Sequence, residues 1–104
     1  MRSLKTLTIG GAVLKISKKI DIETLVLILE GELAGPWVQE VERTWKSEDA
    51  GKRFRRSKFD LSGLTFVSRE GRRLLQQLFA DGVELVSSDL LTRSIVDEIS
   101  RKRG

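Results

Sequence analysis

The residues of this chain that could take part in chemistry lie where an alternating apolar segment ends, in the stretch DLSGLTFVSREG at residues 60–71. Ser68, Arg69 and Glu70 stand there between an expected strand and an expected helix. A hydroxyl, a guanidinium and a carboxylate at such a junction can do chemistry, accept or bind a phosphate, or contact another protein. The rest of the sequence helps to decide among these functions.

The composition argues against catalysis. The chain has 104 residues with no histidine, cysteine or tyrosine, which excludes Ser–His and Cys–His nucleophile pairs and histidine metal sites. Glu30 and Glu32 are two residues apart on an expected strand and would share one face, but two acids are weak grounds for an acid–base pair or a metal site. The chain also has no glycine-rich phosphate loop. We therefore expect no enzymatic activity, no cofactor and no metal.

The formal net charge is +4, and much of the excess lies in the segment KRFRRSK and in the C-terminal RKRG. The basic residues of the first segment are Lys52, Arg53, Arg55, Arg56 and Lys58. Because such clusters can bind phosphate backbones, nucleic-acid binding through this loop and the tail is the alternative function. We favour a solvated loop and a cationic helix end that complements the helix dipole.

No segment resembles a membrane anchor or an export signal. The longest purely apolar run, LVLIL, is far shorter than the ~20 residues that a membrane helix requires. The N-terminal stretch MRSLKTLTIGG lacks the continuous apolar region of a signal peptide. We expect a cytoplasmic protein without membrane insertion.

Hydrophobic periodicity predicts a single small α/β domain. Strands are expected at residues 12–20, 23–33, 57–63 and 83–87, and residues 64–67 are expected to form a connection. The unbroken apolar run at residues 25–29 is typical of a central strand buried on both faces. Successive strand–helix pairs favour a mostly parallel sheet of four to five strands with packed helices. Residues 12–104 would form this domain, and residues 1–11 an N-terminal extension or an edge strand.

Three helices are expected between and after these strands. Pro36 suits the first position of the first helix, and Ser88 or Asp89 is expected to cap the third. Their apolar residues recur every three or four positions, which predicts one buried stripe for each helix: Trp37, Val41 and Trp45; Leu74, Leu75, Leu78 and Phe79; and Leu91, Ile95 and Ile99. This spacing favours core packing of the two tryptophans over base stacking.

The segments LEGELAGP, DLSGLTFVSREG, GVELV and LLTRSIVDEI, in this order, resemble the STAS domain. That domain occurs in anti-sigma factor antagonists and in the cytoplasmic tails of sulfate transporters. The resemblance extends over about residues 13–99 and implies a small β/α domain that regulates a partner by docking, without enzymatic activity. In the antagonists, the strand–helix junction carries an aspartate, two small residues and a glycine. The serine before the glycine accepts phosphate from a kinase that is itself the anti-sigma factor.

This chain departs from the family pattern at the junction. Ser68 stands in place of the aspartate, Arg69 in place of the first serine and Glu70 at the phosphoacceptor position, so that only Gly71 matches. A serine kinase cannot phosphorylate glutamate. Glu70 could act as a permanent, weaker imitation of phosphate, although we favour an ordinary first-turn acid, and we expect Ser68 to cap the helix.

The resemblance implies a docking surface at this junction. The expected surface consists of Ser68, Arg69, Glu70, Gly71, Arg72 and Arg73. Its partner would be a protein with an acidic surface: an anti-sigma factor kinase, another STAS domain or a transporter subunit. Homodimerisation and small-ligand binding are left open.

Overall fold

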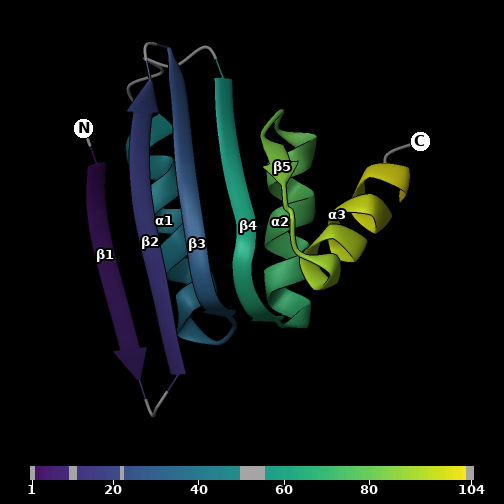
Figure 1. Ribbon diagram of the computed structural model, residues 1–104, viewed down its shortest axis with the longest axis horizontal. Coiled ribbons are helices and arrows are strands. Elements are labelled where there is room, and N and C mark those ends of the chain that lie inside the picture. Colours follow the sequence, from purple (N-terminus) through teal and green to yellow (C-terminus); the bar gives the residue numbers. More distant parts are fainter. Residues whose placement is uncertain (1, 10–11, 22, 50–55, 103–104) are drawn as a thin grey trace.

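The apolar run at residues 25–29 lies in the strand at the middle of the sheet. The computed structural model describes residues 2–9, 12–21, 23–49 and 56–102. In chain order, its elements are β1 (Arg2–Ile9), β2 (Ala12–Asp21), β3 (Thr24–Leu33), α1 (Pro36–Asp49), β4 (Arg56–Val67), α2 (Arg69–Ala80), β5 (Glu84–Val86) and α3 (Leu90–Lys102). The predicted α/β class is confirmed (Figure 1).

The sheet is mixed, and its strands follow the order β1-β2-β3-β4-β5 (Figure 1). β2 is antiparallel to both β1 and β3, whereas β3, β4 and β5 are mutually parallel. Of these five strands, β2 therefore runs against the other four. A helix joins each parallel pair, because parallel strands need a crossover connection. Residues 2–9, at the start of the chain, form one of the two edge strands of the same sheet.

Helices α1 and α2 lie on one face of the sheet (Figure 1). Leu25, Leu27 and Leu29 of β3 are buried, whereas Val26 and Ile28 between them are half-buried. Successive side chains of a strand point to opposite faces, and the helices cover the face of the three leucines. The expected burial of this strand on both faces is therefore wrong.

The apolar stripe of α1 packs as its spacing predicts. Trp37, Val41 and Trp45 are buried, and the ring of Trp45 meets Phe59 of β4 edge-on, with the ring centres 5.8 Å apart. Pro36 is the first residue of α1, where its missing N–H leaves no hydrogen bond unmade. The tryptophans thus belong to the core and present no stacking platform.

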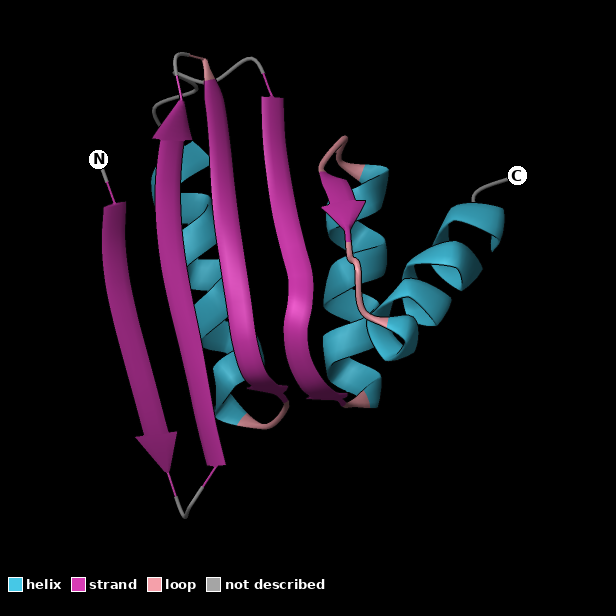
Figure 2. Cartoon of the chain, viewed as in Figure 1, coloured by secondary structure: helices cyan, strands magenta, loops and turns pink. Residues whose placement is uncertain are grey.

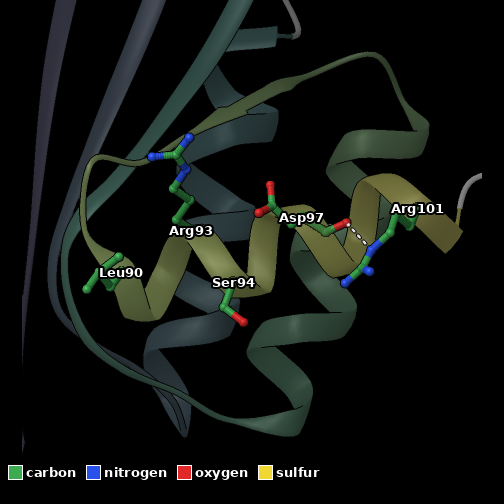
Figure 3. A pocket seen from close by; sticks show the side chains of 5 residues that line it. All are labelled: Leu90, Arg93, Ser94, Asp97 and Arg101. Atoms are coloured by element: carbon green, nitrogen blue, oxygen red, sulfur yellow. Dashed lines mark hydrogen bonds between the residues drawn. The ribbon is translucent and has the colours of Figure 1, made fainter.

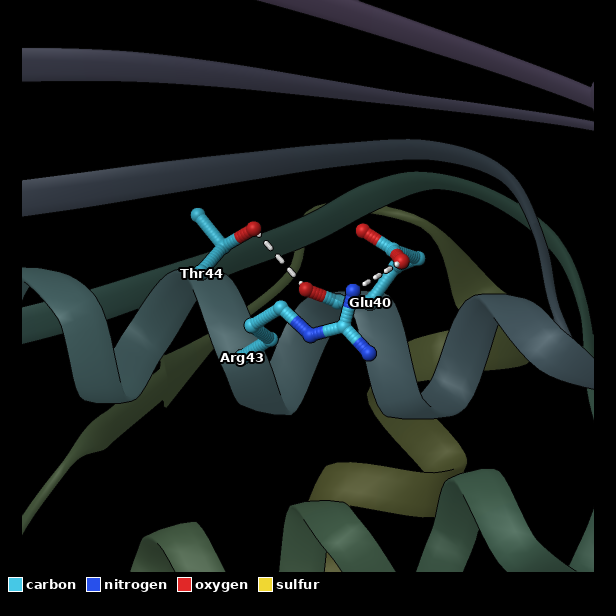
Figure 4. A network of polar contacts seen from close by, with 3 residues as sticks. All are labelled: Glu40, Arg43 and Thr44. Atoms are coloured by element: carbon cyan, nitrogen blue, oxygen red, sulfur yellow. Dashed lines mark hydrogen bonds and ion pairs between the residues drawn. The ribbon is translucent and has the colours of Figure 1, made fainter.

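The outer face of α1 is polar and bonded within the helix (Figure 4). Arg43 Nη1 lies 3.0 Å from Glu40 Oε1, and Thr44 Oγ1 donates to the Glu40 carbonyl at 2.8 Å. Lys46 Nζ lies 3.5 Å from a carboxylate oxygen of Glu42. Exposed pairs of this kind stabilise a helix by less than about 1 kcal/mol. Their carboxylates nevertheless offset the positive charges of Arg43 and Lys46.

Strand β4 is longer than predicted. The expected connection at residues 64–67 belongs to the strand, which runs over Arg56–Val67. Its register against β3 shifts between Ile28 and Glu30 and again after Gly31, and such bulges let a strand bend and continue. Gly31 has a φ of 109°, a conformation that favours glycine. Because the bulges break the two-residue alternation, the pattern in the sequence ends before the strand does.

The face that α3 buries differs from the prediction. The Asp89 carboxylate accepts hydrogen bonds from the N–H groups of Leu91 and Thr92 at 3.1 and 3.4 Å, so Asp89 is the cap. Thr92, Ile95 and Ile99 are buried, whereas Leu91 is 51% exposed. Successive helical residues are about 100° apart around the axis. A face centred on Thr92 and Ile95 therefore turns Leu91 outward, and the expected core position of Leu91 is wrong.

The observed orientation of α3 predicts that truncating Ile95 destabilises the domain more than truncating Leu91. Ile95→Ala should lower the free energy of unfolding by about 2–5 kcal/mol, because it leaves a cavity in the core. Leu91→Ala should lower it by no more than about 1 kcal/mol, because about half of the side chain is in solvent and little apolar area is lost from the core. Urea unfolding of both variants tests this, and equal losses would contradict the observed orientation of α3.

Candidate functional site

The expected site residues lie at the edge of the sheet where β3 and β4 end and where α1 and α2 begin (Figure 2). Because β3 and β4 are parallel, their carboxyl ends meet there, and Leu33 pairs with Val67 at the end of the register. The N–H of Ser68 continues this pairing by donating to the Leu33 carbonyl at 3.0 Å. Parallel sheets normally place their working surfaces at such an edge.

Ser68 is the N-cap of α2, as predicted. Its backbone is extended, with φ −75° and ψ 174°, and its hydroxyl accepts a hydrogen bond from the N–H of Gly71 at 3.1 Å. Its carbonyl accepts the first helical hydrogen bond, from the N–H of Arg72 at 2.9 Å. The cap thus satisfies one of the backbone donors that a helix leaves free in its first turn. Phosphorylation of this hydroxyl would alter the cap.

Gly71 lies where the first turn of α2 presses against the end of β3. The residue is buried, and a Cβ atom added to it would lie 2.6 Å from the Leu33 carbonyl oxygen and 3.1 Å from Val67 Cγ1. Both neighbours belong to the strands that the helix covers, so they cannot move freely. Glycine is therefore needed here for close approach of two backbones.

The charged side chains of the first α2 turns are presented to solvent. Arg69, Glu70 and Arg73 are exposed, and within the described part of the chain none of them forms an ion pair. The helix dipole favours the Glu70 carboxylate by roughly 0.3–1 kcal/mol. Arg72 Nη1 lies 3.4 Å from Glu98 Oε2 of α3, and this half-exposed pair contributes no more than about 1 kcal/mol.

Phe66 adds an aromatic residue that the sequence reasoning did not single out. Its side chain is 51% exposed, it pairs with Glu32 of β3 in the register, and it precedes the Ser68 cap by two positions. Leu64 is buried, and regular alternation would have placed Phe66 on the same face. Only the register beyond the bulges, which depends on the neighbouring strand, reveals the exposed position.

The structure gives no support for a catalytic or metal centre at Glu30 and Glu32. Glu30 is exposed and Glu32 is half-buried, and a register shift falls between them, so simple alternation does not place both on one face. Among the residues that the structure describes, no group of three or more acidic side chains could hold a metal ion.

Most of the basic loop lies outside the described residues. This applies to Lys52, Arg53 and Arg55. Arg56 and Lys58 are the first and third residues of β4. Arg56 is exposed and Lys58 is half-buried. Nucleic-acid binding through this segment therefore stays a prediction.

No helix within the described ranges is both long and apolar enough to cross a bilayer. Comparison of the chain with models of known protein families and with curated proteins found no match. The relation to STAS domains therefore stays a prediction from the sequence motifs.

The capping geometry predicts that removal of the Ser68 hydroxyl destabilises the domain and that a carboxylate at this position preserves its stability. Ser68→Ala should lower the free energy of unfolding by about 1 kcal/mol, because the N–H of Gly71 loses its acceptor. Ser68→Asp should keep most of the stability, since aspartate caps helices as well as serine does. Chemical denaturation measures both, and equal destabilisation by the two substitutions would show that the hydroxyl is not acting as a cap.

The close approach at Gly71 predicts that alanine destabilises the domain. Gly71→Ala should lower the free energy of unfolding by about 1–3 kcal/mol through overpacking, although alanine is about 1 kcal/mol more favourable than glycine in an open helix. Gln77→Ala, at an exposed position of the same helix, serves as the control and should be near neutral. A Gly71→Ala variant more stable than the parent would refute the tight contact.

Proposed function

We propose that the chain is a non-enzymatic docking module of the STAS type. It binds a partner protein through Phe66 and residues 68–73, here named the junction surface. The observation that carries the proposal is the set of exposed groups on either side of the Ser68 cap. Arg69 and Arg73 form no ion pair within the described part of the chain, and Phe66 precedes them as an exposed aromatic residue.

The chemistry of the junction surface suits protein recognition. Arginine and aromatic side chains are enriched at protein interfaces, and Phe66 offers an exposed apolar anchor within seven positions of both arginines in the chain. The Ser68 cap and the contact of Gly71 with Leu33 hold the backbone of this turn. A surface held in place before binding loses less conformational entropy on association. The charge of Arg69 and Arg73 favours an acidic partner surface.

The proposed module binds without the phosphorylation switch of the antagonists. Glu70 occupies the position of the phosphoacceptor and carries one negative charge, where phosphoserine carries nearly two. The Ser68 hydroxyl is engaged in the cap. Glu70 then acts either as a permanent imitation of phosphate or, as we favour, as an acid that stabilises the first turn of α2.

The proposed partner is a protein with an acidic patch, of the classes that the STAS resemblance implies. These classes are a kinase-type anti-sigma factor, a second STAS domain and a transporter subunit, and all three would place this chain in the cytoplasm.

The proposal predicts that reversing two charges on the junction surface weakens partner binding selectively. Arg69→Glu combined with Arg73→Glu should raise the Kd about tenfold or more, because the partner's acidic patch would meet like charge. Binding to purified candidates of the three classes is measured by biolayer interferometry at two salt concentrations. The association rate of the parent chain should fall as salt rises.

The matched control reverses two cations on the outer face of α1. Arg43→Glu combined with Lys46→Glu changes the net charge by the same amount at exposed positions, and it should leave the Kd nearly unchanged. Equal losses from both double variants would indicate attraction by net charge alone. An undiminished affinity of the Arg69→Glu, Arg73→Glu variant would contradict docking through the junction surface.

A further inference from the structure

The outer side of α3 carries an exposed stripe that the junction surface does not include (Figure 3). Leu90, Arg93, Ser94, Asp97 and Arg101 line a surface hollow of about 440 Å³. All five residues are exposed, and Leu90 is 85% exposed. α3 packs beside β5 and α2 at the end of the domain opposite β1 (Figure 1).

The spacing of this stripe is that of a helix-pairing seam. Leu90, Ser94, Asp97 and Arg101 follow one another at intervals of four, three and four residues, which is the a/d spacing of coiled coils. Leu91, 51% exposed, extends the apolar start of the stripe. A seam with one leucine and three polar residues pairs weakly, and its polar positions specify register and orientation.

The charges of the stripe are not neutralised within the described part of the chain. Arg93 and Arg101 each lie one helical turn from Asp97, yet none of the three forms an ion pair. Arg101 Nε instead donates to the backbone carbonyl of Asp97 at 3.4 Å (Figure 3). Because the Asp97 carboxylate has no partner among the described residues, it can accept a hydrogen bond from a group outside this chain.

We propose that this stripe, independently of the junction surface, pairs with the α3 of a second copy of the chain in antiparallel orientation. A two-fold axis between Ser94 and Asp97 sets each Ser94 opposite the partner's Asp97 and each Leu90 opposite the partner's Arg101. The small Ser94 side chain allows close approach at the axis. Each Asp97 then meets the partner's Arg93, and symmetry forms this ion pair twice.

The pairing is self-complementary in charge and apolar contact. Leu90 packs on the aliphatic stem of the partner's Arg101, since arginine can bury its stem while its head stays in water. A helix of 13 residues is only about 20 Å long, so the interface falls in the small, reversible class. We therefore expect a weak, reversible dimer.

A charge swap tests the reciprocal ion pairs. Sedimentation velocity of the full chain from about 5 to 500 µM should show a reversible dimer. Arg93→Asp and Asp97→Arg should each raise the dimer Kd about tenfold or more, because like charges then face each other twice. The variant with both substitutions should return to within about threefold of the parent, because every pair is restored with reversed polarity.

Two controls separate this effect from folding, net charge and the junction surface. Arg43→Asp, on the outer face of α1, makes the same change in charge as Arg93→Asp and should dimerise like the parent. Arg69→Glu with Arg73→Glu should also dimerise like the parent. A parent chain that stays monomeric at 500 µM, or a double swap no tighter than the single variants, would overturn the proposed pairing.

The orientation is tested by disulfide trapping, which is clean because the chain contains no cysteine. Oxidation of a mixture of Leu90→Cys and Arg101→Cys chains should yield mainly the mixed disulfide, since the antiparallel arrangement sets these positions opposite each other. Preferential formation of the Leu90→Cys homodimer would indicate parallel pairing and overturn the proposal.

Discussion

The contact between the first turn of α2 and the end of β3 is the constraint on which the candidate site depends. The Ser68 N–H binds the Leu33 carbonyl, and Gly71 approaches the same carbonyl so closely that no side chain fits between them. These two backbone contacts set the point at which the chain turns from strand into helix. Once the turn is fixed, the burial of Gly71, Leu74 and Leu75 leaves the side chains between them exposed.

The charge pattern that results differs between the two helices on this face of the sheet. Arg43 and Lys46 of α1 lie beside carboxylates of their own helix. Arg69 and Arg73 of α2 have no such partner within the described residues. An arginine without an intramolecular ion pair has no carboxylate nearby to offset its positive charge. This uncompensated charge can attract and orient an acidic partner during association.

Local signals in the sequence were sufficient to predict most elements of the fold. Pro36 identified the start of α1, the four-residue spacing of Trp37, Val41 and Trp45 identified its buried face, and Asp89 was one of two predicted caps for α3. The Ser68 cap was also predicted, because a capping side chain bonds within three residues of itself. Each of these features depends on neighbours that are close in the chain.

The features that the sequence did not reveal depend on distant neighbours. The continuation of β4 through residues 64–67 follows from bulges in its pairing with β3, and these bulges also decide that Phe66 is exposed while Leu64 is buried. The packing of α3 buries Thr92 and exposes Leu91, although apolar spacing favoured the leucine. The half-burial of Val26 and Ile28 depends on the helices covering the other face. None of these outcomes can be read from a local pattern.

Amide hydrogen exchange of the chain, free and saturated with its protein partner, tests the central claim most directly. Docking through the junction surface predicts that protection on binding is concentrated at residues 66–73, with little change in α1. Protection confined to residues 52–58 or to β1, with exchange at residues 66–73 unaltered, would contradict the claim.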